Sequence, residues 1–247
     1  MLTNLKQSIS DNDFIRTLVQ SLLIMGDSIR PIVQKPIVSQ FIGNHLHQYA
    51  LDAGCGRGLY TRILIKRAQK VAALDYSEES VNTLKRRLGH LPHLSLHVGS
   101  ADNLPFEAEQ FDLVLHCEVL EHIENDRKVL SELFRVLQPG GRLIISVPVP
   151  PAPYNDSEHV REGYTLDQIS QLLYNSGFEI LRHEYCMFKF SKKLMQFLVW
   201  WGQKTRIRLP SLFLLPVYWE RITKQSISEH NLPYDVVIEA RKPSLNK

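Results

Sequence analysis

The sequence has few of the features that mark secreted or membrane-spanning proteins. It contains only three cysteines, Cys55, Cys117 and Cys186. Their odd number and wide spacing argue against a disulfide framework or a zinc knuckle, so a reducing compartment is the simplest interpretation. No uncharged apolar run reaches the roughly 18 residues of a spanning helix, and the first residues, MLTNLKQSIS, lack the layout of a signal peptide. We therefore expect a cytoplasmic protein, at most peripheral at a membrane.

A strong charge of one sign is also missing. The formal net charge is +3 over 247 residues, which is too small by itself to indicate nucleic-acid binding. The hydrophobic fraction of 44% and the charged fraction of 22% are ordinary for a globular protein. There is no internal repeat and no low-complexity tract. The length is enough for one sizeable core, and we predict a single domain over residues 1–247.

Strand and helix patterns alternate along most of the chain. Buried strand patterns such as YALDAG, KVAALDYS and RLIISVPV are separated by amphipathic helical patterns. This alternation predicts an α/β fold with a doubly wound, mostly parallel sheet. The predicted parts are an N-terminal helical cap over 1–48, a core over 49–186, a helical insertion over 187–233 and a last strand over 234–242.

Several predicted helices have defined ends. The patterns predict helices over 14–25, 59–69, 77–89 and 124–141. Ser77 is the predicted N-cap of the third, and Pro139-Gly140-Gly141 the predicted end of the fourth. Thr165 and Gln168 fit a capping box for a later helix that ends at Gly177.

The segment YALDAGCGRG places Gly54, Gly56 and Gly58 at alternate positions directly after a buried strand. Ligands of open α/β sheets bind beyond the carboxyl ends of the strands. A glycine there lets backbone N–H groups approach a ligand that a Cβ would repel. The alternative is a tight turn without a ligand, but three glycines with Asp52 favour the ligand loop. The dinucleotide fingerprint G-x-G-x-x-G fails because Leu59 occupies its third position.

The spacing D-x-G-x-G-x-G, from Asp52 to Gly58, resembles the first motif of class I S-adenosylmethionine-dependent methyltransferases. Asp75 and Asp102 follow the next two strands. The stretch FDLVLHCEVLEHIENDRKVLSELFRVLQPGGRLIISVP resembles the small-molecule group that includes the ubiquinone- and menaquinone-biosynthesis enzymes. The resemblance covers about residues 48–186 and the last strand. It implies a seven-stranded Rossmann-like sheet with the last strand antiparallel, and S-adenosylmethionine as cofactor.

The resemblance also implies a role for individual residues. Asp75 would accept hydrogen bonds from the ribose hydroxyls and Asp102 from the adenine amino group, while Asp52 and Cys117 would lie near the methionine part. The implied cofactor-binding set is Asp52, Gly54, Gly56, Gly58, Asp75, Tyr76, Ala101, Asp102 and Cys117. The alternatives are a helix-capping role for Asp75, a turn-forming role for Asp102 and a purely packing role for Cys117.

Candidates for the chemistry lie near the ends of the fourth and fifth strands. An oxygen or nitrogen acceptor favours a general base, and His122, His159 and Tyr164 are the predicted catalytic residues. The string EVLEHI places Glu118, Glu121 and His122 on one face if it is helical. Some relatives with a similar string bind a divalent metal through it, and His159 could then be a fourth ligand. The alternative is a helix start with a locally bonded histidine, and we predict no metal.

The segment 187–224 differs from the rest of the chain. It combines short apolar runs and all three tryptophans with one acid and eight basic residues: Lys189, Lys192, Lys193, Lys204, Arg206, Arg208, Arg221 and Lys224. This composition fits a helical lid over a hydrophobic acceptor, a peripheral membrane contact or a single-stranded nucleic-acid surface. The alternative is a helical subdomain that packs its aromatic side chains on the sheet and exposes its lysines. We predict a small-molecule acceptor, leave a lipid-like acceptor and a peripheral membrane contact open, and expect no nucleic acid.

Two further functions stay open. The first is methylation of RNA or protein, but the string His116-Cys117-Glu118-Val119 after the fourth strand lacks the motifs of the base-amino and carbon-5 enzymes. The second is a non-catalytic S-adenosylmethionine-binding module that serves a partner. The prediction is methyl transfer to a small hydrophobic acceptor by in-line displacement.

Overall fold

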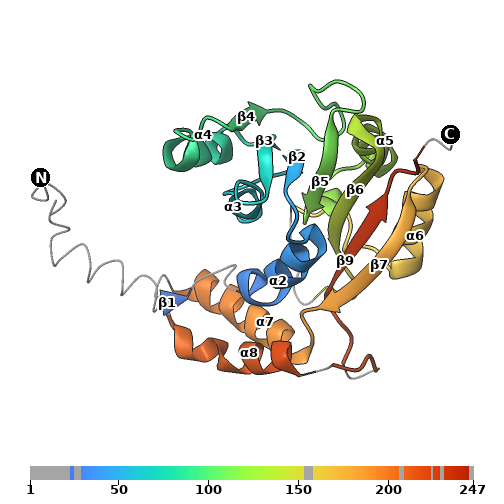
Figure 1. The fold of residues 1–247 in the computed structure, drawn as a ribbon. Coiled ribbons are helices and arrows are strands. Elements are labelled where there is room, and N and C mark those ends of the chain that lie inside the picture. The colour runs from blue at the N-terminus through green and yellow to red at the C-terminus, as the bar shows by residue number, and fades with distance from the viewer. Residues whose placement is uncertain are drawn as a thin grey trace, which may run out of the picture.

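A seven-stranded sheet with helices on both faces forms the centre of the computed structural model, which describes residues 23–24, 29–152, 158–205, 209–223, 225–228 and 231–244 (Figure 1). The strand order is β4-β3-β2-β5-β6-β9-β7. The strands are β2 (His47–Ala53), β3 (Ala68–Asp75), β4 (Leu94–Val98), β5 (Phe111–Cys117), β6 (Leu137–Pro148), β7 (Glu179–Cys186) and β9 (Asp235–Arg241). Only β9 runs antiparallel to its neighbours in this sheet. This confirms the predicted fold class.

The helices pack in two layers. They are α2 (Arg30–Ile42), α3 (Thr61–Leu64), α4 (Glu78–Leu88), α5 (Asp126–Val136), α6 (Leu166–Asn175), α7 (Lys189–Lys204) and α8 (Leu215–Ile222). Buried side chains of α2, α3, α7 and α8 share one core layer. Those of α5 and α6 share the layer on the opposite face of the sheet. Two short 3₁₀ helices, η1 (Leu120–His122) and η2 (Ser211–Leu214), and a two-stranded pair of β1 (Leu23–Ile24) with β8 (Leu209–Pro210) complete the described elements.

Two of the predicted helix starts are confirmed by their caps. The Ser77 side chain accepts a hydrogen bond from the Ser80 N–H at 3.2 Å, at the start of α4. The Thr165 hydroxyl and the Gln168 side chain form the full reciprocal capping box of α6. These caps satisfy N–H groups that have no partner inside the helix, so local sequence alone fixes where both helices begin.

Two predicted helices are shorter than expected. The pattern over 59–69 forms only α3, because the chain already pairs with β2 from Ala68 onward. The helix expected over 124–141 ends at Val136, and Pro139-Gly140-Gly141 lie within β6. There the Gly140 N–H donates to the Lys242 carbonyl at 2.8 Å, so pairing with the end of the chain replaces the helical bonds.

The N-terminal cap and the insertion are only partly described. The helix predicted over 14–25 lies outside the described residues, apart from the short strand β1. The predicted cap is represented by α2, and the predicted insertion contains α7, β8, η2 and α8. Because β9 is antiparallel, it begins at the edge where β5, β6 and β7 end, and α7 and α8 lie beyond that edge (Figure 1).

Candidate functional site

The glycine loop follows β2 directly and all three glycines have positive φ. A Cβ on Gly54 would lie 2.2 Å from Val119 Cγ2, and one on Gly58 2.4 Å from Leu84 Cδ1. A Cβ on Gly56 would meet nothing within 4 Å. The protein's own side chains therefore fill the space at Gly54 and Gly58, which corrects the hypothesis that the ligand excludes a side chain at all three. Gly56 is the position with an open backbone.

Asp75 organises this loop from the end of β3. Its carboxylate accepts hydrogen bonds from the Gly56 N–H at 2.7 Å and the Ser77 N–H at 2.9 Å, one on each oxygen. The residue is buried, whereas its neighbour Tyr76 is 77% exposed. A carboxylate oxygen offers about two acceptor positions. Asp75 therefore supports the turn before α4 and keeps acceptor capacity on both oxygens for a ligand such as a ribose diol.

Asp52 lies beneath the loop and is almost completely buried. The Thr61 hydroxyl donates a hydrogen bond to it. Burial raises the pKa of Asp52 to about 6, with the hydrogen bond from Thr61 opposing the shift and the charge of Asp75 adding to it. This carboxylate therefore changes charge near neutral pH, and its ionised form would gain from a nearby cation such as an ammonium group.

The other predicted cofactor residues line the same edge of the sheet. Ala101 is buried, and Asp102 is half-exposed with an oxygen 4.0 Å from Lys128 Nζ. Cys117 ends β5 and is buried, and burial raises the pKa of its thiol, so it stays protonated. Asp52 and Asp75 thus lie at the carboxyl ends of β2 and β3, and Asp102 lies in the loop after β4. Ligands of open α/β sheets bind at this edge.

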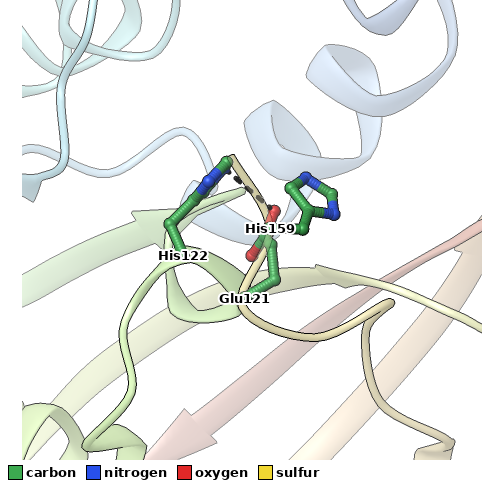
Figure 2. Close-up of side chains that lie close together, drawn as sticks. All are labelled: Glu121, His122 and His159. Carbon is green, nitrogen blue, oxygen red and sulfur yellow. Dashed lines mark ion pairs between the residues drawn. The ribbon is translucent and has the colours of Figure 1, made fainter. Parts of the chain in front are cut away.

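A group of three titratable side chains lies next to the end of β5 (Figure 2). One ligand atom each of Glu121, His122 and His159 lies within 4.8 Å of the others. The two imidazole rings are T-shaped with 4.6 Å between centroids, and His122 Nε2 lies 3.8 Å from Glu121 Oε1. Glu121 and His122 come from η1, and His159 from the loop after β6. The structure therefore brings two predicted catalytic histidines together around one buried carboxylate.

Glu118 does not belong to this group, which corrects the expectation of one helical face. The residue has φ +57° and lies between β5 and η1, outside any helix. Its carboxylate accepts hydrogen bonds from Arg30, Gln34 and Ser146 instead. The group of Glu121, His122 and His159 could hold a proton or a cation, but the four-residue set considered from the sequence is not assembled.

Tyr164 is tied to the loop that carries His159. Its hydroxyl accepts a hydrogen bond from Arg161 Nη1 at 2.6 Å and donates one to Asp126 at 3.1 Å. Arg161 also donates to the carbonyls of Leu120 and Ile123, so it links this loop to η1. Burial raises the pKa of Tyr164 well above its usual value, which keeps the phenol protonated. These contacts support a role in holding the loop, and a direct role in catalysis stays a prediction.

The structure contains a second polar cluster that the sequence did not predict. It joins Arg30 and Gln34 of α2 to Glu118, Ser146 and Asp235 at the carboxyl edge of the sheet. Gln34 and Asp235 are 201 positions apart. The one sequence signal is a glutamine within the apolar pattern PIVQKPIV, which by itself does not indicate a site.

The helices α7 and α8 present an apolar and basic surface. Their acid, Glu220, is buried and accepts hydrogen bonds from the N–H groups of Phe188, Phe190 and Ser191 at 3.0, 2.6 and 3.1 Å. The exposed large apolar side chains from α7 to α8 are Phe190, Trp200, Leu212, Phe213, Leu215, Tyr218, Trp219 and Ile222. In the described part of the chain, no helix is long and apolar enough to cross a membrane.

Comparisons with known proteins agree with this geometry. Residues 51–145 match the methyltransferase domain family. The demethylmenaquinone methyltransferase of Clavibacter sepedonicus is 36% identical over 117 residues, which are 47% of this chain and 46% of the relative. The phthiotriol/phenolphthiotriol dimycocerosates methyltransferase 1 of Mycobacterium ulcerans is 33% identical over 134 residues, 53% of this chain and 48% of the relative. The chain thus spans about half the length of these relatives.

The fold also matches solved structures. The S-adenosylmethionine-dependent methyltransferase of Mesorhizobium loti superposes with a TM-score of 0.57 at 18% identity, over 83% of this chain and 96% of that one. The residues fit the family's cofactor, because Gly56 offers an open backbone and Asp75 an ordered carboxylate beside it. Residues 51–145 thus match a methyltransferase domain, and the relatives that share this part of the sequence are methyltransferases.

Proposed function

We propose that this protein transfers a methyl group from S-adenosylmethionine to a small, hydrophobic acceptor. The observation that carries the proposal is the pair of Gly56, with its open backbone, and Asp75, whose carboxylate is fixed beside it by two N–H groups. The names of the matched relatives, which refer to demethylmenaquinone and to phthiotriol lipids, support an apolar acceptor.

In this proposal the chain supplies position and electrostatics, and the cofactor supplies an activated methyl group. Asp75 would hold the ribose, Asp102 the adenine edge and the loop of Gly54, Gly56 and Gly58 the methionine part. Ionised Asp52 would attract the ammonium group through the loop. His122 and His159, which lie beside the carboxylate of Glu121, are the proposed groups that pass the proton released at the acceptor on to water.

The segment 187–224 would cover the acceptor and touch a membrane. The surface of α7, η2 and α8 exposes aromatic and aliphatic side chains among lysines and arginines, while Glu220 is turned inward. Basic and aromatic residues together favour the interface of an anionic bilayer. This surface lies at the edge where the strands end (Figure 1), so a lipid-like acceptor would enter the site from it.

The first experiment is calorimetric titration with S-adenosylmethionine, S-adenosylhomocysteine and, as control, NAD. Micromolar binding of the first two alone supports the proposal, and no binding of either would overturn it. Transfer of a radioactive methyl group to cell extracts then separates the acceptor classes. Label in the organic phase supports a small hydrophobic acceptor, label in acid-precipitable material supports RNA or protein, and tight binding without transfer supports a non-catalytic module.

The membrane contact is tested with vesicles. The full chain should sediment with phosphatidylglycerol vesicles and much less with phosphatidylcholine vesicles of equal size. Trp219→Ala, which removes a 53% exposed ring, should lower the bound fraction. Tyr174→Ala is the matched control, because Tyr174 is 73% exposed on α6, outside this surface. Equal binding by all three proteins would contradict the contact.

A further inference from the structure

A cluster of charged and polar side chains surrounds Glu118 at the end of β5. Arg30 Nη2 donates to Glu118 Oε2 at 2.8 Å, and Gln34 Nε2 and Ser146 Oγ donate to Oε1 at 2.7 and 2.8 Å. The donors come from α2 and β6, on either side of the acid. Glu118 itself stands at φ +57°, a conformation that costs free energy in a residue with a side chain and that is commonest at functional sites.

Asp235 adds a second carboxylate to this cluster. Gln34 Nε2 also lies 3.2 Å from Asp235 Oδ2, and Arg30 Nε lies 3.8 Å from the same oxygen. The Tyr60 hydroxyl donates to Gln34 Oε1 and so fixes the orientation of the amide. The Arg30 guanidinium thus contacts two carboxylates, of which Asp235 is fully buried. Carboxylate oxygens accept hydrogen bonds, so they favour a ligand group that donates one.

The position of Glu118 relative to the cofactor loop suggests which ligand it meets. It lies between Cys117 and Val119, and Val119 is the side chain that covers Gly54. Asp75 and Asp102 lie on the other side of the loop, beyond β3 and β4. Glu118 therefore stands at the end of β5, on the opposite side of the loop from Asp75 and Asp102.

Glu118 retains capacity for one more hydrogen bond. A carboxylate has about four acceptor positions, and the described residues fill three of them. The remaining position is on Oε2, and the side chain is 13% exposed. Glu118 therefore offers one oxygen to a hydrogen-bond donor on a ligand.

We infer that Glu118 binds a hydroxyl group of the methyl acceptor and takes its proton; this rests on the proposed methyl transfer. The hydroxyl oxygen forms the new bond to the methyl carbon, the bond from that carbon to sulfur breaks, and its electron pair stays on sulfur. The hydroxyl proton passes to Glu118 Oε2 and then to water. The reaction is accordingly an O-methylation, and Arg30, Gln34 and Ser146 are positioning residues that hold the carboxylate.

The test uses the full chain saturated with S-adenosylhomocysteine, and 4-octylphenol as probe. Its methyl ether, 4-octylanisole, has the same apolar body without the donor. We expect the phenol to bind about tenfold more tightly than the ether, the effect of one hydrogen bond to a charged group. Glu118→Gln should make the two affinities equal and leave the affinity for S-adenosylhomocysteine within twofold. Glu79→Gln, at an exposed position of α4, should change neither.

Several results would contradict the assignment of a hydroxyl-binding role to Glu118. Equal affinity of the wild type for phenol and ether, or no binding of either, removes the hydroxyl site. A preference for 4-octylaniline over the phenol assigns the site to amines. A large loss of S-adenosylhomocysteine affinity in Glu118→Gln assigns the residue to the cofactor. If Glu118→Gln unfolds, Ser146→Ala is the replacement variant. It removes one donor to Glu118 and should weaken the binding of the phenol, without changing the affinity for the ether or for S-adenosylhomocysteine. Failure of the wild type to bind S-adenosylhomocysteine contradicts the proposed function instead.

Discussion

The two halves of the carboxyl edge of the sheet are built in different ways. On the side of β2 and β3, the acids bond to groups 2 to 19 positions away: Asp52 to Thr61, and Asp75 to the N–H groups of Ser77 and Gly56. On the side of β5 and β9, Glu118 is bound by side chains 28 to 88 positions away. The first half is encoded in short motifs, whereas the second exists only once α2 has docked on the sheet.

This difference predicts different responses to mutation. A change in the first half should alter cofactor binding with little effect on the remote cluster, because its contacts are local. A change in the second half should alter the docking of α2 and acceptor binding, and leave the cofactor loop intact. The hydrogen bond from the Tyr60 hydroxyl to Gln34 joins the two halves. Because contacting residues often interact non-additively, single and double variants would measure how strongly the halves are coupled.

The largest effect is expected in the cofactor half. Asp75→Ala removes a carboxylate that holds Gly56 and would hold the ribose, and it should weaken S-adenosylmethionine binding by about 1–3 kcal/mol, the value of hydrogen bonds to a charged group. Calorimetry measures the loss. Glu79→Ala, which changes an exposed acid on the following helix, is the control. Unchanged affinity of Asp75→Ala would remove Asp75 from the site.

A change in the other half should affect stability instead. Gln34→Leu removes the amide that donates to both Glu118 and Asp235, and the loss of hydrogen bonds to charged groups costs about 1–3 kcal/mol. The free energy of unfolding from urea titration should fall by that amount. The affinity for S-adenosylhomocysteine should stay within twofold. A comparable loss of affinity would mean that the two halves are coupled.

The pH dependence of binding sharpens the role of Asp52. Burial raises its pKa to about 6, so the carboxylate is largely protonated at pH 5 and largely ionised at pH 7. An amino group with a pKa near 8 stays charged throughout this range. If the ionised acid attracts the ammonium group, S-adenosylmethionine should bind about tenfold more weakly at pH 5 than at pH 7. Asp52→Asn should flatten the profile; a profile identical to wild type would contradict this role.

The smallest effect is expected from metal removal. EDTA should leave S-adenosylmethionine binding and methyl transfer unchanged, because Glu118 is bound by Arg30 and does not join Glu121, His122 and His159. Thermal melts with and without Mg²⁺ or Zn²⁺ provide a second readout. Activity lost in EDTA and restored by either ion would establish a metal site in this group.

The sequence predicted the fold and the cofactor half because their signals are local. Alternating strands and helices, the D-x-G-x-G-x-G spacing and the caps at Ser77 and Thr165 all lie within a few residues. The predictions that failed concern residues whose structure depends on tertiary contacts. The helix predicted over 124–141 ends at Val136, and Gly140 beyond it pairs with Lys242. Glu118, which was expected on a helical face, lies outside a helix and binds Arg30 of α2.

The cluster around Glu118 could not have been predicted from the sequence. Arg30 and Gln34 share a face of α2 at a spacing of four, but no spacing relates them to Ser146 or Asp235, which belong to two other elements. Side chains at such distances meet because strand order and helix docking bring them together. A single sequence therefore indicates which half of the edge binds the cofactor, whereas the acceptor half has to be taken from the structure.

The contacts of Glu220 limit how the segment from α7 to α8 can be altered. The carboxylate near the end of α8 binds N–H groups at the beginning of α7, about 30 positions earlier. The segment is thus a closed loop in which the last helix caps the first. A truncation that removes α8 would release the start of α7 as well, so the segment can be exchanged between homologues only as a whole. Glu220→Gln, which keeps the shape and removes the charge, would reveal how tightly that loop is closed.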